Sequence, residues 1–294
     1  MSEVSRRLPI VPRREPDLGL DGDAIPKYWF EGDAFRTRFF DAMSCLFPEG
    51  EKFFIECVRD YRDRIQDPAL KAQVKDFIYQ EGQHGMAHTR YNNRLQRQGI
   101  RVDVILERQK KILAGLRRIM PASLTLAQTA AAEHMTAMMA HSFMQRPELF
   151  RHADPNIRAL YYWHAVEEIE HKAVAFDVLK RVARATWFTR CFAMLYVSLL
   201  FPFETFMVMN HMFKVDGLKQ RWKLWLKGLW WMYRPGGLFM SMLPHYFRYY
   251  LPGFHPWQVG NLQAQQQWLE AYTRSGDDPV FAADALIEPK VATA

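Results

Sequence analysis

The chain has 294 residues, of which 49% are hydrophobic and 24% charged, and its formal net charge is +7. The three widely spaced cysteines exclude a disulfide framework and a zinc ribbon, so we expect a cytoplasmic protein, either free or peripheral at the inner face of the membrane. Because no nucleic-acid motif accompanies the basic excess, we expect no nucleic-acid partner, and instead a membrane surface or an acidic substrate.

Apolar residues recur at three- and four-residue spacing along most of the chain and alternating strand patterns are sparse, which predicts an all-α protein. An N-terminal arm, residues 1–28, is expected to be disordered or held on the surface. The expected helices then cover residues 33–46, 51–64, 67–99, 103–118, 123–144 and 154–184. A turn at Pro48-Glu49-Gly50 separates the first two. Asp67 and Asp154, each followed by proline, are expected to cap the helices that they open.

The composition becomes rich in aromatic residues and methionine after residue 186. We therefore divide the chain into a helical bundle at 29–186, an aromatic-rich helical region at 187–274 and an extended tail at 275–294. Residues 191–203 are almost wholly apolar, but a membrane span needs about 20 residues, so a buried or re-entrant helix is expected.

One stripe of the aromatic-rich region, on residues 222–233, combines tryptophan, leucine and tyrosine with lysines along its flank. This pattern is typical of a helix that lies in a membrane interface. A core helix and a homodimer contact are the alternatives.

Two Glu-x-x-His motifs, Glu81 with His84 and Glu168 with His171, lie on separate predicted helices. Residues three apart share one face of a helix, so each motif offers an oxygen and a nitrogen to a metal ion. The first motif shares its face with apolar residues of the same helix, which predicts that the metal face is also the buried one.

Lone glutamates on the two other helices alternate with these motifs. Glu133 lies in a segment of alanine and methionine, where an unpaired carboxylate implies a metal, another cation or a bound proton. On the first helix, Glu51 lines up with apolar residues, whereas Glu56 lines up with charged ones and Glu49 falls in the turn. We therefore choose Glu51 as a ligand and keep Glu49 in reserve.

Further polar residues surround the motifs. His164 projects from the same face as the second motif and is a predicted seventh ligand. His88, one turn after the first motif, is assigned as an acid or base, with direct ligation and an outer-sphere role as alternatives. Glu167 and Glu170 flank the metal face and are expected to form salt bridges in solvent. Carboxylate-rich ligation favours two iron ions, with manganese or a mixed pair as alternatives.

The order of glutamates and Glu-x-x-His motifs resembles the ferritin-like di-iron carboxylate superfamily over residues 29–184, which implies a four-helix bundle. His164, placed before the second motif, extends the resemblance to the arylamine N-oxygenase branch, which implies O₂-dependent oxidation. The whole chain, with its Phe47-Pro48-Glu49-Gly50-Glu51 turn and aromatic C-terminal region, resembles a bacterial family labelled "predicted metal-dependent hydrolase".

Our leading hypothesis is therefore a non-haem di-iron oxygenase or oxidase that uses O₂ to hydroxylate, desaturate or N-oxygenate a hydrophobic, lipid-like substrate. Electrons are expected from an external donor, because no flavin or nicotinamide fingerprint is present. A dinuclear metal-dependent hydrolase is the first alternative. A non-catalytic metal-binding or membrane-associated helical protein is the second.

Overall fold

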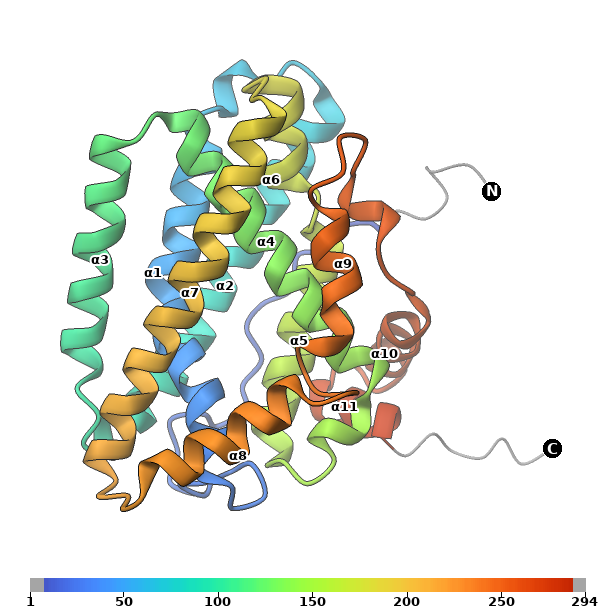
Figure 1. Ribbon diagram of the computed structural model, residues 1–294. Coiled ribbons are helices and arrows are strands. Elements are labelled where there is room, and N and C mark those ends of the chain that lie inside the picture. Colours follow the sequence, from blue (N-terminus) through green and yellow to red (C-terminus); the bar gives the residue numbers. More distant parts are fainter. Residues whose placement is uncertain (1–7, 288–294) are drawn as a thin grey trace.

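The computed structural model describes residues 8–287, and over this range the chain is helical, with one isolated bridge between Phe30 and Ala153 and no strand (Figure 1). The predicted all-α class is confirmed. The helices are α1 Ala34–Arg59, α2 Pro68–Arg97, α3 Val102–Ile119, α4 Ala122–Gln145, α5 Pro155–His171, α6 Val174–Asp177, α7 Trp187–Val215, α8 Arg221–Tyr233, α9 Leu243–Arg248, α10 Gln263–Arg274 and α11 Pro279–Ile287.

Four helices, α1, α2, α4 and α5, form the centre of the molecule. The helix α1 packs along α2 and α4 packs along α5, while contacts of α1 with α4 and of α2 with α5 close the group (Figure 1). Asp67 caps α2 and Asp154 caps α5, as predicted, each accepting hydrogen bonds from backbone N–H groups of its first turn. Each of the four helices therefore turns one side toward a shared interior.

The expected break in the first helix is wrong, because α1 runs unbroken from Ala34 to Arg59 with Pro48 inside it. A proline within a helix removes the N–H that would bond to the carbonyl four residues earlier. Here that carbonyl belongs to Ser44, and the side chain of Asn92 on α2 donates to it at 2.9 Å. The neighbouring helix thus satisfies the group that Pro48 leaves unpaired, and Glu51 is held within a regular helix.

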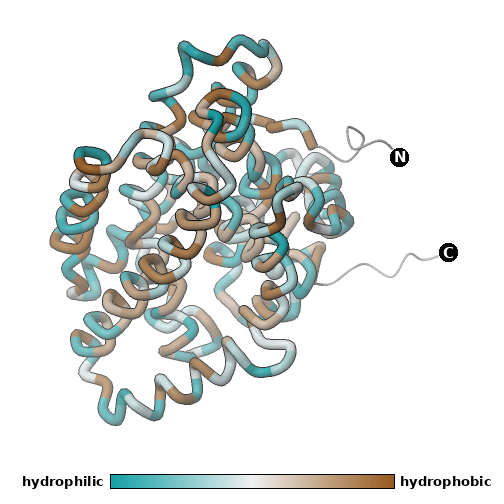
Figure 2. The backbone as a smooth tube through the Cα atoms, turned by 45° about the horizontal axis from the view of Figure 1, so that its top comes forward, coloured by the Kyte–Doolittle hydropathy of each residue, from teal (hydrophilic) through white to brown (hydrophobic). Residues whose placement is uncertain are grey.

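The helix α7 is much longer than the expected 191–203 segment, and it continues through Pro202. It packs along α1 and α4, and at its end Asp216 accepts two hydrogen bonds of 2.8 Å from Arg38 of α1. Its most apolar 18-residue window has a mean hydropathy of 1.7, so the helix is long and apolar enough to cross a membrane, and 28% of that window is buried. Figure 2 colours the apolar residues of the backbone brown. The expectation of a buried helix at residues 191–203 is therefore wrong, because composition does not reveal which side of a helix is covered by other helices.

Both ends of the described chain pack onto the bundle. The expected extended tail is wrong for Pro279–Ile287, which form α11 against α5 and α10, with Asp278 accepting from the N–H groups of its first turn. At the other end, the backbone N–H of Val11 donates to Glu170 of α5 at 3.2 Å, which agrees with an arm held on the surface. Residues 1–7 and 288–294 lie outside the described residues. The domain boundaries stay predictions.

Candidate metal centre

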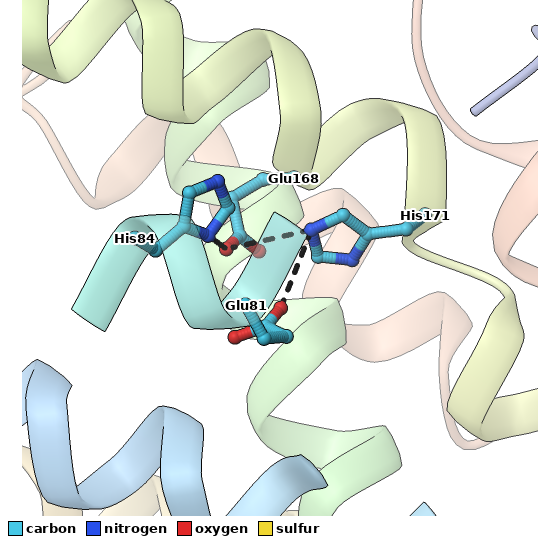
Figure 3. Close-up of side chains that lie close together, drawn as sticks. All are labelled: Glu81, His84, Glu168 and His171. Atoms are coloured by element: carbon cyan, nitrogen blue, oxygen red, sulfur yellow. Dashed lines mark ion pairs between the residues drawn. The ribbon is translucent and has the colours of Figure 1, made fainter. Parts of the chain in front are cut away.

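The structure brings all the predicted ligands together in the space between α1, α2, α4 and α5. No member of the set is more than 6% exposed. They are Glu51 from α1, Glu81 and His84 from α2, Glu133 from α4, and His164, Glu168 and His171 from α5. Figure 3 shows the two Glu-x-x-His pairs pointing toward one another from α2 and α5. The helices α2 and α5 contribute residues spaced three or four apart, which share one face of the helix, whereas α1 and α4 contribute one glutamate each.

The donor atoms fall into two groups, each compact enough for one ion. In the first group, one ligand atom from each residue of the two Glu-x-x-His motifs lies within 4.8 Å of all the others. In the second group, Glu51, His88 and His164 meet the same condition. Nitrogen and oxygen ligands at about 2.0–2.2 Å from a common ion lie at most about 4.4 Å apart, so a small contraction closes each group around a cation.

Buried donor atoms without partners test whether these residues fit a metal. A polar atom left unpaired in the interior costs about 1–3 kcal/mol, so several in one place need an explanation. Among residues 8–287, no hydrogen-bond partner reaches the following buried atoms: Oε1 and Oε2 of Glu51, Oε1 and Oε2 of Glu81, Nδ1 of His84, Oε1 of Glu133 and Nε2 of His171. All of them belong to predicted ligands, and carboxylate oxygens and imidazole nitrogens are the atoms that a pair of divalent cations would bind.

The clustered carboxylates of the centre also favour the binding of cations. Burial, reinforced by neighbouring carboxylates, raises the pKa of Glu51 and of Glu81 well above the usual range. Burial likewise raises the pKa of Glu133 to about 7, against the opposing effect of His171. Burial without a cation therefore disfavours the charged form of these carboxylates, and bound divalent ions would stabilise that form.

His171 lies at the middle of the centre. Its Nδ1 is 2.9 Å from Oε2 of Glu133, and its Nε2 is 3.3 Å from Oε1 of Glu81. Burial lowers the pKa of His171, but Glu133 and Glu168 outweigh it and raise the pKa to about 9. This imidazole therefore connects the lone glutamate of α4 with the first motif on α2.

Glu167 and Glu170 form the expected salt bridges, but both are buried, so the prediction that they lie in solvent is wrong. The guanidinium of Arg13 reaches Glu167 at 3.3 Å and Glu170 at 2.9 Å. Glu167 in turn lies 3.0 Å from Nε2 of His84, which leaves Nδ1 of His84 free for a metal. The error arose because helix periodicity cannot show that the N-terminal arm folds over this side of α5.

His88 is fully buried behind His164. Its Nε2 lies 2.8 Å from Nδ1 of His164, and its Nδ1 lies 2.9 Å from Oγ of Ser44, which donates to Asn92. Such a chain fixes the orientation and tautomer of a ligating histidine. An acid–base role for His88 would therefore act through His164, and that role stays a prediction.

An apolar cavity of about 110 Å³ lies next to the centre, between α3 and α7. Glu51 and Thr136 are among the polar residues that line it, and Thr136 also donates a hydrogen bond to Glu168. The rest of its wall is mostly aliphatic and aromatic, including Leu200 and Met139. Sequence reasoning missed Thr136, although its spacing of three residues from Glu133 placed it on the same face of α4.

A model of a protein family described as "Predicted metal-dependent hydrolase" matches residues 12–260. The match spans all the predicted ligands and extends through α9. No curated protein and no solved structure gives a significant match to the chain. The resemblance to this family that the sequence suggested is thereby confirmed: the chain belongs to the family of predicted metal-dependent hydrolases.

Proposed function

We propose that this chain is a dinuclear metal-dependent hydrolase that acts on an apolar ester or amide. The observation that carries the proposal is the convergence of unpaired, buried carboxylate and imidazole atoms from four helices on one space beside an apolar cavity. The family description favours hydrolysis over the oxidation that the ligand pattern suggested. A metal pair supplies Lewis acidity toward water and toward the carbonyl oxygen of a substrate.

The residues around the centre would share the remaining tasks. Glu81, His84, Glu168 and His171 would hold one ion, and Glu51 and His164 would contribute to holding the second. Glu133, whose Oε1 lacks a partner, would complete the shells. The apolar cavity wall would bind the substrate chain and exclude bulk water, with Thr136 placed to orient the polar end.

Oxidation with O₂ is the second candidate, because the donor set itself favours it. The ligands are rich in carboxylates and lie on helices, which suits iron or manganese, alone or as a mixed pair, better than a structural zinc site. This reaction would require electrons from a separate donor.

Metal loading under nitrogen separates the two candidates. Protein loaded with Fe(II), Mn(II) or Zn(II) is assayed first for the number of bound ions, then for cleavage of fatty-acyl p-nitrophenyl esters without O₂, and finally for O₂ consumption. Two ions with ester cleavage support the hydrolase, whereas two Fe(II) ions with stoichiometric O₂ uptake and no cleavage support oxidation. If Glu81→Gln binds as many ions as the unchanged protein, the proposed centre is wrong and both candidates fall.

A further inference from the structure

Large apolar side chains are exposed in a stripe along α7 and in a second stripe along α8. Phe188 is 76% exposed and Leu199 is 68% exposed, although both belong to an apolar helix. We call this the α7–α8 surface, and it consists of Phe188, Phe192, Leu195, Leu199 and Phe203 on α7 with Trp222, Leu226, Trp230 and Tyr233 on α8. Both helices lie on the near side of the molecule in Figure 1. Apolar patches of this extent on a folded protein mark a contact with another molecule or a membrane.

Positive charge accompanies the same part of the chain. Residues 187–251 contain eight lysines and arginines but only two acidic residues, a net charge of +6 in a chain whose total is +7. Both acidic residues already form salt bridges, Glu204 with Arg108 and Asp216 with Arg38 at 2.8 Å. Lys223 and Lys227 are exposed beside the tryptophans of α8, and the long 3.7 Å contact of Lys227 with Asp33 leaves its ammonium group largely in solvent. The partner of this surface therefore carries negative charge as well as apolar groups.

We propose that the α7–α8 surface docks on a membrane that contains anionic phospholipids. A helix with an apolar face and flanking lysines lies in the interface, with the lysine charges at the level of the headgroups. A two-fold contact with a second copy is disfavoured, because it would bring the exposed lysines and arginines of both copies toward each other.

The packing of α7 against the helical bundle argues against a membrane-spanning role for this helix. The side of α7 opposite the exposed stripe packs on α1 and α4. Arg190 on that helix is buried, where it donates to the carbonyl of Leu251 at 2.7 Å. A spanning α7 would have to leave both the bundle and these polar contacts, so docking along the membrane surface is the arrangement that keeps the fold.

The docking surface adjoins the cavity of the candidate metal centre. Tyr196, Val197 and Leu200 line the cavity, while the neighbouring Leu195 and Leu199 are exposed on the α7–α8 surface. An apolar cavity of about 150 Å³ is known to hold a benzene-sized group, so one of about 110 Å³ takes a short segment of an acyl chain. If the proposed function holds, the substrate class is an acyl ester. It would leave the membrane, enter the cavity between α3 and α7 and reach Glu51.

Vesicle sedimentation tests the docking without any need for activity. The full-length, metal-free protein is mixed with vesicles of phosphatidylcholine alone or of phosphatidylcholine with phosphatidylserine. We expect binding to the anionic vesicles, weakened by salt. Each cation near an anionic surface contributes about fivefold to partitioning, so Lys223→Glu/Lys227→Glu should lower binding by roughly 25-fold or more. The matched control Lys71→Glu/Lys75→Glu, on exposed lysines of α2, should bind like the unchanged protein.

Trp222→Ser/Leu226→Ser should also weaken binding while leaving the circular dichroism spectrum and the number of bound metals unchanged. Equal sedimentation with and without phosphatidylserine, or resistance of the bound protein to high salt and alkaline carbonate, overturns docking. The α7–α8 surface belongs instead to a contact with a second copy if the unchanged protein does not bind vesicles, is a dimer in light scattering, and becomes a monomer in the variant Trp222→Ser/Leu226→Ser. If docking is observed but Lys223→Glu/Lys227→Glu cleaves a vesicle-embedded ester as fast as the unchanged protein, the proposed substrate route is wrong and the docking proposal stands.

Discussion

Replacing Glu51 with methionine should have opposite effects on the metal-free and the metal-loaded protein. Both carboxylate oxygens of Glu51 are buried and lack a hydrogen-bond partner among the described residues, which costs about 1–3 kcal/mol for an unpaired buried group. Methionine has a similar volume and no such group, so Glu51→Met leaves no large cavity. We expect the metal-free variant to be more stable than the unchanged protein by about 2 kcal/mol, which raises Tm by about 4 °C.

With metal the order should reverse, because the variant lacks a ligand and loses the stabilisation that bound ions give to the folded state. Thermal unfolding followed by circular dichroism, with EDTA-treated and Mn(II)-loaded protein at pH 7, measures both effects. Glu49→Met on the same helix is the matched control, since Glu49 is partly exposed, and its stability should change by less than about 0.5 kcal/mol. A metal-free Glu51→Met that is less stable than the unchanged protein, or one that binds both ions normally, would refute the assignment.

Three further perturbations address the centre and its surroundings. The folded-state pKa values of Glu167, about 8, and His171, about 9, are raised above their unfolded values, so the stability that they contribute is lost as pH rises through them. The metal-free protein should therefore lose about 3 kcal/mol between pH 7 and pH 9 in urea titrations, and a rise in stability over this range would contradict the assignment. Arg13→Ala should release Glu167 and weaken metal binding by about 10–100-fold in a competition titration with a chelator, whereas an unchanged affinity would remove Arg13 from the centre. Leu200→Trp should fill the cavity and raise KM for acyl esters about tenfold with the metal count unchanged, and a KM that stays constant would exclude the cavity as the substrate site.

The sequence alone predicted the helical class, the capped starts of α2 and α5, and which side chains would meet. This was possible because the fold class and the helix faces follow from local rules. Apolar periodicity places residues three and four apart on one face, and a carboxylate among alanines, as at Glu133, is stable inside a protein only with a cation or proton. The family of predicted metal-dependent hydrolases was indicated separately, by the resemblance of the whole chain, and the family match confirms it.

The tertiary structure decided what depends on distant segments meeting. Asn92 of α2 satisfies the carbonyl that Pro48 frees, so α1 stays continuous where local rules predicted a turn. Arg13 folds over α5 and buries Glu167, which its helix position alone assigned to solvent. Periodicity reports the faces of a single helix, whereas burial, ion pairing and the cavity beside Glu51 depend on which other helix or arm covers each face.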